Sequence, residues 1–506
     1  MTTISAFLDR IDSQYGDRPA FISDNRTLTF SAFRQRTARV AGGLSALGVR
    51  AGDRVLVWLP NVPAWLEVAC ACAQLGAIAI ACNTRFRSTE VGDILERSRA
   101  KLLVFWPEFK SIPFVDILGE VPAAQLVSLE TVVRYDDADW LHSPGNAPAD
   151  AGCAATPSGG RGAGQSRALE RMREVSYRSL LDADPPSATG ADHEGAVQPD
   201  GNSGFLCFLT SGTTSRPKLA LHSHAGIVQH AYDMAHALGY AEPEVRVLTM
   251  NPLCGVLGFN QALAALAAGV PQVLPLFFDA ADVAGTIPRE RITHALGIDE
   301  AFHRVFDRAN SERPFPTLRV IGGGSYNGDY EALVRRAQTL GITAIGIYGM
   351  SEVGAVFACQ RVDAPSVKRA TAGGYPVSVE ARVRARDPES GRLLPPDETG
   401  ELEFSGPSRM LGYLDDPAST ARAVTSDGFV RSGDIGSTHT DGSFSFVSRT
   451  GDALRLSGFL VSPLEIAGVL EAHPSVARCQ IVGCTVAAVT RPVAFDIPRQ
   501  PGVIDE

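Results

Sequence analysis

A hydroxyl-rich segment that ends in a lysine is the part of this sequence best suited to chemistry. Residues 210–218 read Thr-Ser-Gly-Thr-Thr-Ser-Arg-Pro-Lys and follow the apolar run 205–209, which predicts a loop at the end of a strand. Hydroxyl groups, free backbone N–H groups and one ammonium are the donors that a polyphosphate requires. Lysine is scarce elsewhere and occurs only at positions 101, 110 and 368. The residues expected to contact phosphate are Thr210, Ser211, Gly212, Thr213, Thr214 and Lys218.

A simpler interpretation of the same segment is a polar surface turn, because Ser, Thr, Gly and Pro are common in such turns. The preceding strand and the terminal lysine favour phosphate binding over this interpretation. The segment is not a Walker P-loop, because the pattern Gly-x-x-x-x-Gly-Lys-Ser/Thr is absent and a proline precedes the lysine.

Two more clusters of small or polar residues follow apolar runs that are typical of strands. Gly322-Gly323-Gly324-Ser325 follows residues 318–321, and Tyr348-Gly349-Met350-Ser351-Glu352 follows residues 342–347. Loops at the carboxyl ends of neighbouring parallel strands are where α/β sheets bind ligands. Glycines at 322–324 would let a flat base lie against the backbone, although a structural turn explains the glycines alone equally well.

Size and composition limit the classes of function. A chain of 506 residues is expected to form more than one domain. Its net charge of −10 argues against binding to nucleic acid or to anionic membranes. Nine cysteines without the spacing of a disulfide framework predict reduced thiols and a cytoplasmic protein. No run reaches the ~18 apolar residues of a membrane span, so we expect none.

Alternating strand-like and helix-like segments predict an α/β fold. Between residues 31 and 105, and again from 205 to 347, the alternation indicates a large domain of mostly parallel sheets covered by helices. Residues 134–202 lack periodicity and are rich in Pro, Ala, Gly, Ser and Asp, so we expect a disordered insertion in which only 168–181 could be helical. Residues 372–448 contain strand-like runs and Asp-Gly turns, which predict a small β-rich subdomain.

The order of these motifs resembles that of the adenylate-forming superfamily, which includes acyl-CoA synthetases, firefly-type luciferases and the adenylation domains of peptide synthetases. The acyl-CoA synthetases are the most similar. On this resemblance, residues 1–448 are an AMP-binding, acyl-activating domain, and residues 449–506 are a truncated α+β C-terminal lid domain. The motifs are, in order, 210–218, 348–352, Gly400-Glu401-Leu402, Met410-x-Gly412-Tyr413, Arg431-Ser432-Gly433-Asp434, Arg449, Leu456-Ser457-Gly458 and Val461-x-Pro463-x-Glu465-Ile466.

Members of this superfamily join a carboxylic acid to the α-phosphate of ATP, release pyrophosphate and pass the acyl group to a thiol. The resemblance therefore implies ATP, Mg²⁺ and coenzyme A as cofactors, with Lys218, Ser351 and Glu352 as catalytic residues. The loop 210–218 would hold the β- and γ-phosphates, Glu352 would bind Mg²⁺ and Ser351 would contact the α-phosphate. A solvated surface carboxylate is the simpler interpretation of Glu352, and its place at a strand end disfavours it.

The resemblance also implies a nucleoside site, in which Tyr348 packs against adenine, Asp434 accepts both ribose hydroxyls and Arg449 reaches the same ribose. Asp434 lies in a Gly-Asp-Ile sequence that is otherwise typical of a turn, and Arg431 in its motif favours the ribose interpretation. Small residues below the adenine and others beside Tyr348 complete the ATP site: Gly323, Gly324, Ser325, Gly349 and Met350.

An acyl pocket at Cys254, Phe259 and Gly346 and a coenzyme A channel at Gly458 are further implications of the resemblance. Many relatives have histidine or an aromatic residue where Cys254 stands. No aspartate is present in residues 251–255 to bind an α-amino group, which argues for a non-amino carboxylic acid. Gly458 is explained equally well as a turn glycine.

A departure from the superfamily leaves two hypotheses open. Relatives have a lysine in a Gly-Lys motif near the C-terminus, whereas this sequence has no lysine after Lys368. One hypothesis is an AMP-forming acid–thiol ligase, weakened by a short lid, that acts on a small-molecule, non-amino carboxylic acid (a fatty or an aryl acid) with coenzyme A or a carrier-protein pantetheine and forms a homodimer. The other is a catalytically impaired protein that binds nucleotide or acyl-adenylate. A P-loop kinase or NTPase fits poorly.

Overall fold

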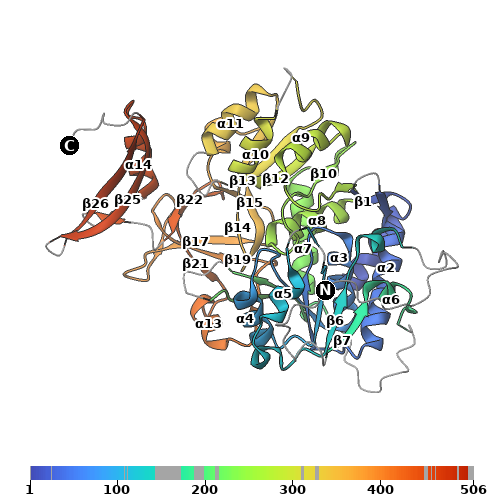
Figure 1. The fold of residues 1–506 in the computed structure, drawn as a ribbon. Coiled ribbons are helices and arrows are strands. Elements are labelled where there is room, and N and C mark those ends of the chain that lie inside the picture. Colours follow the sequence, from blue (N-terminus) through green and yellow to red (C-terminus); the bar gives the residue numbers. More distant parts are fainter. Residues whose placement is uncertain are drawn as a thin grey trace.

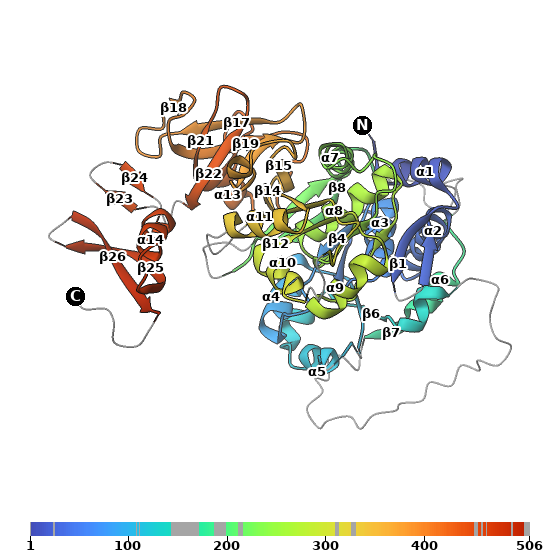
Figure 2. The ribbon, with the colours of Figure 1, turned by 90° about the horizontal axis from the view of Figure 1, so that it is seen from above.

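In the computed structural model, two large β-sheets surrounded by helices make up the body of the protein (Figure 1). A smaller C-terminal unit contains α14 (Pro463–Glu471) and the hairpin of β25 (Val476–Val486) and β26 (Val489–Pro498), drawn in red in Figures 1 and 2. No helix in the described part of the chain is long and apolar enough to cross a membrane. The structure describes residues 2–23, 26–107, 109–110, 112–142, 172–186, 199–210, 216–308, 313–324, 330–449, 454–456, 459–461, 463–486 and 489–499.

The first sheet positions the loop 210–218. Its central strands pair in parallel, whereas β9 runs antiparallel to β8 and β20 runs antiparallel to β9 at the edge. The central strands are almost wholly apolar because helices cover both of their faces. In spatial order the strands are β20 (Gly412–Tyr413), β9 (Leu219–Ser223), β8 (Gly204–Leu209), β4 (Ile78–Ala81), β3 (Arg54–Trp58), β5 (Leu102–Phe105), β6 (Thr131–Arg134) and β7 (Arg173–Ser176).

The second sheet has a parallel half and an antiparallel half, which join where β14 pairs with β15. The β-rich region predicted for 372–448 forms most of the antiparallel half. In spatial order the strands are β18 (Leu393–Leu394), β17 (Arg382–Arg386), β19 (Gly400–Ser405), β21 (Val430–Thr438), β22 (Phe444–Arg449), β16 (Gly373–Pro376), β15 (Gly354–Cys359), β14 (Thr343–Met350), β13 (Val320–Gly324), β12 (His294–Ile298), β10 (Val247–Leu248), β11 (Gln272–Val273), β1 (Pro19–Ser23) and β2 (Arg26–Thr29).

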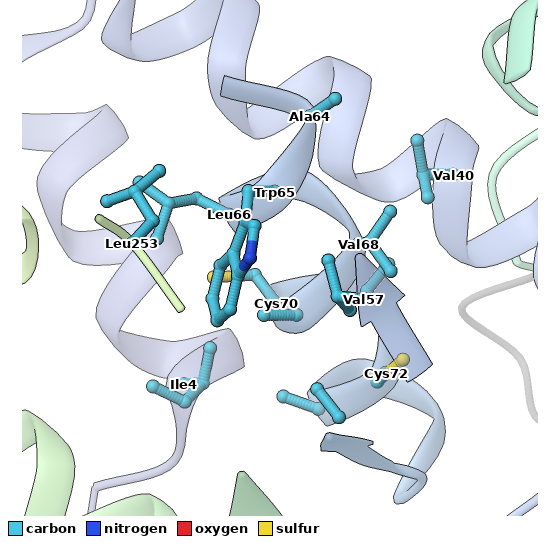
Figure 3. Close-up of a cluster of buried hydrophobic side chains, with 14 of the residues drawn as sticks. Ile4, Val40, Val57, Ala64, Trp65, Leu66, Val68, Cys70, Cys72 and Leu253 are labelled. Carbon is cyan, nitrogen blue, oxygen red and sulfur yellow. The ribbon is translucent and has the colours of Figure 1, made fainter. Parts of the chain in front are cut away.

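Helix α3 (Pro63–Leu75) lies in the main hydrophobic core. Proline at its first position suits a helix start, and Gly76 ends it with φ of 69°. Apart from Glu67, the helix buries apolar residues around its whole circumference, and its Cys70 and Cys72 are fully buried free thiols. Figure 3 shows Trp65, Leu66 and Val68 of this helix together with Ile4, Val40, Val57 and Leu253.

The remaining helices lie around the two sheets (Figures 1 and 2). They are α1 (Ile4–Tyr15), α2 (Phe30–Ala46), α4 (Ser88–Ser98), α5 (Phe114–Gly119), α6 (Tyr177–Leu181), α7 (His224–Ala237), α8 (Val256–Ala268), α9 (Ala280–Arg289), α10 (Asp299–Phe306), α11 (Tyr330–Thr339), α12 (Ser366–Arg369) and α13 (Pro417–Ala423), with the 3₁₀ turns η1 (Ala123–Leu126) and η2 (Asp137–Leu141). The C-terminal unit also contains the short pair β23 (Leu454–Leu456) and β24 (Phe459–Val461).

Part of the predicted disordered insertion 134–202 is built into the fold. Residues 173–176, expected at most to be helical, form the strand β7 beside β6, and α6 is the α-helix among the described residues of this segment. The 3₁₀ turn η2 (Asp137–Leu141) lies outside 168–181, in a part of the insertion for which no helix was expected. Parallel pairing with β6 holds β7, and a buried polar contact holds the helix α6 that follows it: Arg36 binds Glu67 at 2.6 Å, and the hydroxyl of Tyr177 donates to the same carboxylate at 2.6 Å. Residues 143–171 and 187–198 lie outside the described residues.

Candidate active site

The two ends of the loop 210–218 are joined by one backbone–backbone hydrogen bond and one bond from a backbone amide to a side chain. The amide of Thr210 donates to the carbonyl of Lys218 at 2.9 Å, and the amide of Lys218 donates to Oγ1 of Thr210 at 3.2 Å. The antiparallel pairing of β8 with β9 therefore extends to the two ends of the loop, with Lys218 at its exit. The other predicted phosphate contacts lie outside the described residues: Ser211, Gly212, Thr213 and Thr214.

One aromatic side chain, that of Tyr413, lies against both Lys218 and Glu352. The Nζ atom of Lys218 stands over the Tyr413 ring, 4.8 Å from its centroid. The Tyr413 hydroxyl donates a hydrogen bond to Oε1 of Glu352 at 2.8 Å. The ammonium and the carboxylate predicted to meet one triphosphate are therefore held at a single point of the structure.

Burial and neighbouring charges act in opposite directions on Glu352. The side chain is 8% exposed, and this burial raises the pKa of its carboxyl group. The hydrogen bond from Tyr413 acts against the rise, as do the positive charges of Arg449 and Lys218, because each favours the anion. The backbone carbonyl of Glu352 accepts a hydrogen bond from the amide of Met410 at 2.8 Å. Glu352 is therefore fixed by both its side chain and its backbone.

Buried polar side chains hold the turn that carries Ser351 and Glu352. The hydroxyl of Ser351 donates to the carbonyl of Leu209 at 3.2 Å, which joins this turn to the end of β8. Nε2 of His222 lies 2.7 Å from the carbonyl oxygen of Ser351, and since a carbonyl can only accept, Nε2 carries the proton. His230 donates in the same way to the carbonyl of Ala355 at 2.6 Å.

The residues predicted for the ribose also meet. Asp434 and Arg449 are partners across β21 and β22, and the Arg449 Nε atom lies 2.9 Å from Oδ1 of Asp434. The hydroxyl of Tyr348 donates to Oδ2 of Asp434. Burial raises the pKa of the Asp434 carboxyl, while these two contacts oppose the rise. Oδ2 therefore accepts a hydrogen bond, whereas Oδ1 is ion-paired with Arg449 but has no hydrogen-bond partner among the described residues, and it is the oxygen that a ribose hydroxyl could reach.

Tyr348 itself is enclosed by aromatic rings. It is 7% exposed, and its ring centroid lies 5.1 to 5.9 Å from those of Phe404, Phe444 and Phe446. The neighbouring Gly349 is exposed and Met350 is half-buried. Stacking of adenine on Tyr348 stays a prediction, and in this structure most of the ring surface is covered by its neighbours.

The glycine cluster on β13 contains one open position. A Cβ atom on Gly323 would lie 2.5 Å from the carbonyl oxygen of Gly297 and 3.2 Å from the Tyr330 ring. A Cβ atom on Gly324 would have its nearest neighbour, the carbonyl oxygen of Ile347, at 3.7 Å. Gly323 thus makes room for the Gly297 carbonyl and the Tyr330 ring, and Gly324 is the position with space for a base. Ser325 lies outside the described residues.

The three predicted acyl-pocket residues have different surroundings. Phe259 is fully buried, and its ring packs against Trp65 and Phe208. A Cβ atom on Gly346 would lie 2.1 Å from the carbonyl oxygen of Thr371, so its glycine makes room for that backbone. Cys254 is half-buried, and burial raises the pKa of its thiol to about 12, which makes it a poor nucleophile. The acyl pocket remains a prediction, and Gly458 lies outside the described residues.

The side chains near Glu352 suit Mg²⁺ that arrives with a triphosphate. Among the described residues, no group of three or more His, Cys, Asp or Glu side chains could hold a metal by itself. Mg²⁺ in nucleotide sites is held by one or two carboxylates together with phosphate oxygens and water. Glu352 supplies one buried carboxylate, and Tyr413 is its only side-chain donor among the described residues. The donor set therefore fits.

Sequence reasoning did not assign roles to several residues that organise this site. Tyr413 stands in a motif that was recognised without a function. His222, His230 and Asn260 gave no signal, because a single buried histidine or asparagine has no spacing pattern. Asn260 accepts a hydrogen bond from the amide of Ala355 at 3.0 Å.

The fold and the site define the class of the protein. A lysine-terminated loop, a buried carboxylate and an Asp–Arg pair converge between two α/β sheets, as expected for an enzyme that activates acids with a nucleotide. The family model described as AMP-binding enzyme matches residues 8–414, and the chain belongs to this family.

Relatives and solved structures agree with this family. The chain is 29% identical over 490 residues to a CoA ligase of Rhodococcus jostii named for a methyl-dioxo-octahydroindenyl-propanoyl group, with 95% of this chain and 86% of the relative covered. It is 27% identical to 2-methylpropanoate–CoA ligase of Humulus lupulus, with 94% and 82% covered. The crystal structure of ATP-bound MatB from Rhodopseudomonas palustris has the same fold, with a TM-score of 0.77, 20% identity and coverage of 100% of this chain and 90% of that one.

Proposed function

We propose that the protein is an AMP-forming acid–thiol ligase that converts a non-amino carboxylic acid to its coenzyme A thioester. The observation that carries the proposal is the convergence of the Lys218 ammonium and the Glu352 carboxylate on Tyr413, at the exit of the loop 210–218. The family match and the two relatives named as CoA ligases support it. ATP, Mg²⁺ and coenzyme A are the cofactors of this reaction.

The first step joins two anions, so the protein must neutralise charge and fix positions. An oxygen of the acid forms a bond to the α-phosphorus of ATP, while the bond to the β-phosphate oxygen breaks and pyrophosphate takes that electron pair. Lys218 supplies a positive charge to the leaving pyrophosphate. Mg²⁺, when bound, neutralises further phosphate charge, and Glu352 is its protein ligand. Ser351, on the turn that also carries Glu352, would contact the α-phosphate.

The second step transfers the acyl group. The sulfur of a coenzyme A thiolate forms a bond to the acyl carbon, and the bond from that carbon to the AMP oxygen breaks, so AMP leaves with its electron pair. Gly458 is proposed to line the channel for the thiol, and Cys254, Phe259 and Gly346 to border the acid. A carrier-protein pantetheine is the alternative acceptor.

The alternative of a nucleotide-binding protein without ligase activity has less support. The AMP-binding match and the ligase names of relatives that align over most of this chain favour an enzyme.

ATP–pyrophosphate exchange against aliphatic, alicyclic and aryl acids tests the proposal. We expect exchange with at least one acid, and we expect Lys218→Ala to lower its rate about 100-fold, because removal of one charge-stabilising group has an effect of this size. Lys368→Ala is the matched control, since Lys368 is exposed on α12. The proposal is wrong if no acid supports exchange and ATP does not bind, or if the two lysine variants behave alike.

A further inference from the structure

The motif Met410-x-Gly412-Tyr413 has no assigned role, and the structure places it against the phosphate loop. Tyr413 on β20 pairs with Ala220 on β9, two residues after Lys218. The amide of Leu411 donates to the carbonyl of Leu221 at 2.7 Å, and the amide of Leu414 donates to that of Leu219 at 2.8 Å. The backbone of Tyr413 is thus fixed relative to the exit of the loop.

A second set of contacts fixes Tyr413 relative to the turn of Glu352. The amide of Met410 donates to the carbonyl of Glu352 at 2.8 Å, three residues before Tyr413. The amide of Tyr413 donates to Oγ1 of Thr420 at 2.9 Å, which ties the strand to α13. The Tyr413 side chain is 8% exposed, so neither its ring nor its hydroxyl is free to move into solvent.

The two functional contacts of Tyr413 use different parts of its side chain. The hydroxyl donates to Oε1 of Glu352 at 2.8 Å, whereas the ring face meets the ammonium of Lys218. A hydrogen bond to a carboxylate fixes the direction of that carboxylate, and a cation held over an aromatic face is attracted by the ring quadrupole. The two contacts can therefore be removed one at a time by substitution.

We propose that Tyr413 is a positioning residue that sets the distance between the metal-binding carboxylate and the phosphate-binding ammonium. Its hydroxyl orients Glu352 for a divalent cation, and its ring holds Lys218 for the phosphates. This inference rests on the proposed function, because it takes Mg²⁺ and ATP as the ligands of these two groups. A merely structural tyrosine would support the fold without changing how nucleotide binding depends on Mg²⁺.

Equilibrium binding of the β,γ-imido analogue of ATP at a series of Mg²⁺ concentrations separates these roles. Tyr413→Phe removes the hydroxyl and keeps the ring. We expect it to raise the Mg²⁺ concentration for half-maximal binding about tenfold, the size of one hydrogen bond to a charged group, with affinity at saturating Mg²⁺ within about twofold of the wild type. Tyr413→Leu should show the same shift and also bind the analogue about fivefold more weakly at saturating Mg²⁺.

Two controls keep the result specific. Tyr375→Phe removes the hydrogen bond from the Tyr375 hydroxyl to Asp441, a phenol–carboxylate contact of 2.9 Å outside the site, and should leave the Mg²⁺ dependence unchanged. In a Glu352→Gln background, Tyr413→Phe should cause no further shift, because the carboxylate that it orients is gone. Thermal unfolding of each variant verifies that it is folded.

A wild-type Mg²⁺ dependence in Tyr413→Phe would overturn the role of the hydroxyl. Equal affinity of the Phe and Leu variants at saturating Mg²⁺ would overturn the role of the ring. An equal shift in the presence and absence of the Glu352 carboxylate would show that Tyr413 acts through the fold. If the wild type binds no analogue at any Mg²⁺ concentration, the proposed function itself fails, and this inference fails with it.

Discussion

Lowering the pH should destabilise the protein through His224, the first residue of α7. The side chain is fully buried, and burial lowers the pKa of its imidazole to about 4. Its Nδ1 atom accepts a hydrogen bond from the amide of Ile4 at 3.3 Å, so Nδ1 has no proton. Protonation of Nδ1 would break this hydrogen bond. It would also place a positive charge at a helix N-terminus, where cations are unfavourable.

The sign and size of the effect follow from the two pKa values. The unfolded histidine has a pKa near 6.5, above the folded value of about 4, so the unfolded state binds more protons between these values. The contribution of His224 to the free energy of unfolding is fully present above pH 6.5 and is lost as the pH falls toward 4. With these pKa values, the linkage relation gives a loss of about 2 kcal/mol between pH 7 and pH 5.

Urea denaturation of the wild type and of His224→Asn at pH 7, 6 and 5 measures this contribution. Asparagine keeps an acceptor near the Ile4 amide and does not titrate. The wild type should lose about 2 kcal/mol more than the variant over this range, because only the wild type gains a proton on unfolding. Parallel stability curves for the two proteins would refute the reasoning, since they would show that the His224 ring titrates alike in both states.

Two further variants test the supports of the site and the fold. His222→Phe should lower the rate of pyrophosphate exchange about tenfold by leaving the Ser351 carbonyl without its donor, and His222→Gln should recover most of the loss; a Gln variant as slow as Phe would contradict this. Arg36→Met should lower the free energy of unfolding by about 3–5 kcal/mol, because Glu67 stays buried without its partner. Arg39→Met, a half-buried change on the same helix, should cost about 1 kcal/mol, and equal losses would contradict the argument.

The parts of the site that could be predicted from sequence are those with a local pattern. The loop 210–218 has a distinctive hydroxyl-rich composition, and Tyr348 to Glu352 follow a strand-like run, so the position of both segments at strand ends could be predicted. The chemistry expected of these residues stays a prediction. The mixed α/β fold follows from the alternation of apolar runs with helix-like segments. These inferences need only residues close together in the chain.

The parts that could not be predicted depend on contacts between distant segments. Strand β7 was missed because three of its four residues are polar and only its pairing with β6 reveals it as a strand. The helix α6 that follows it is held by the buried Arg36–Glu67–Tyr177 cluster, whose members come from three separate helices. The enclosure of Phe259 by aromatic rings and of Gly346 by the 371 backbone likewise has no local signature. A sequence pattern identifies which side chains are available, and tertiary packing decides which of them reach a ligand.

The site lies where the two sheets meet, and this explains why Tyr413 is so closely connected. Lys218 and Tyr413 belong to strands or strand ends of the first sheet, whereas Tyr348, Asp434 and Arg449 belong to the second. Glu352 follows β14 of the second sheet and is bound through its side chain and its backbone to the segment around β20 of the first. In the proposed site, the phosphates would therefore be bound by residues of the first sheet and the ribose by residues of the second. Any shift of one sheet against the other would change the separation of Lys218 from Asp434, and the contacts of Tyr413 and Met410 with Glu352 oppose such a shift.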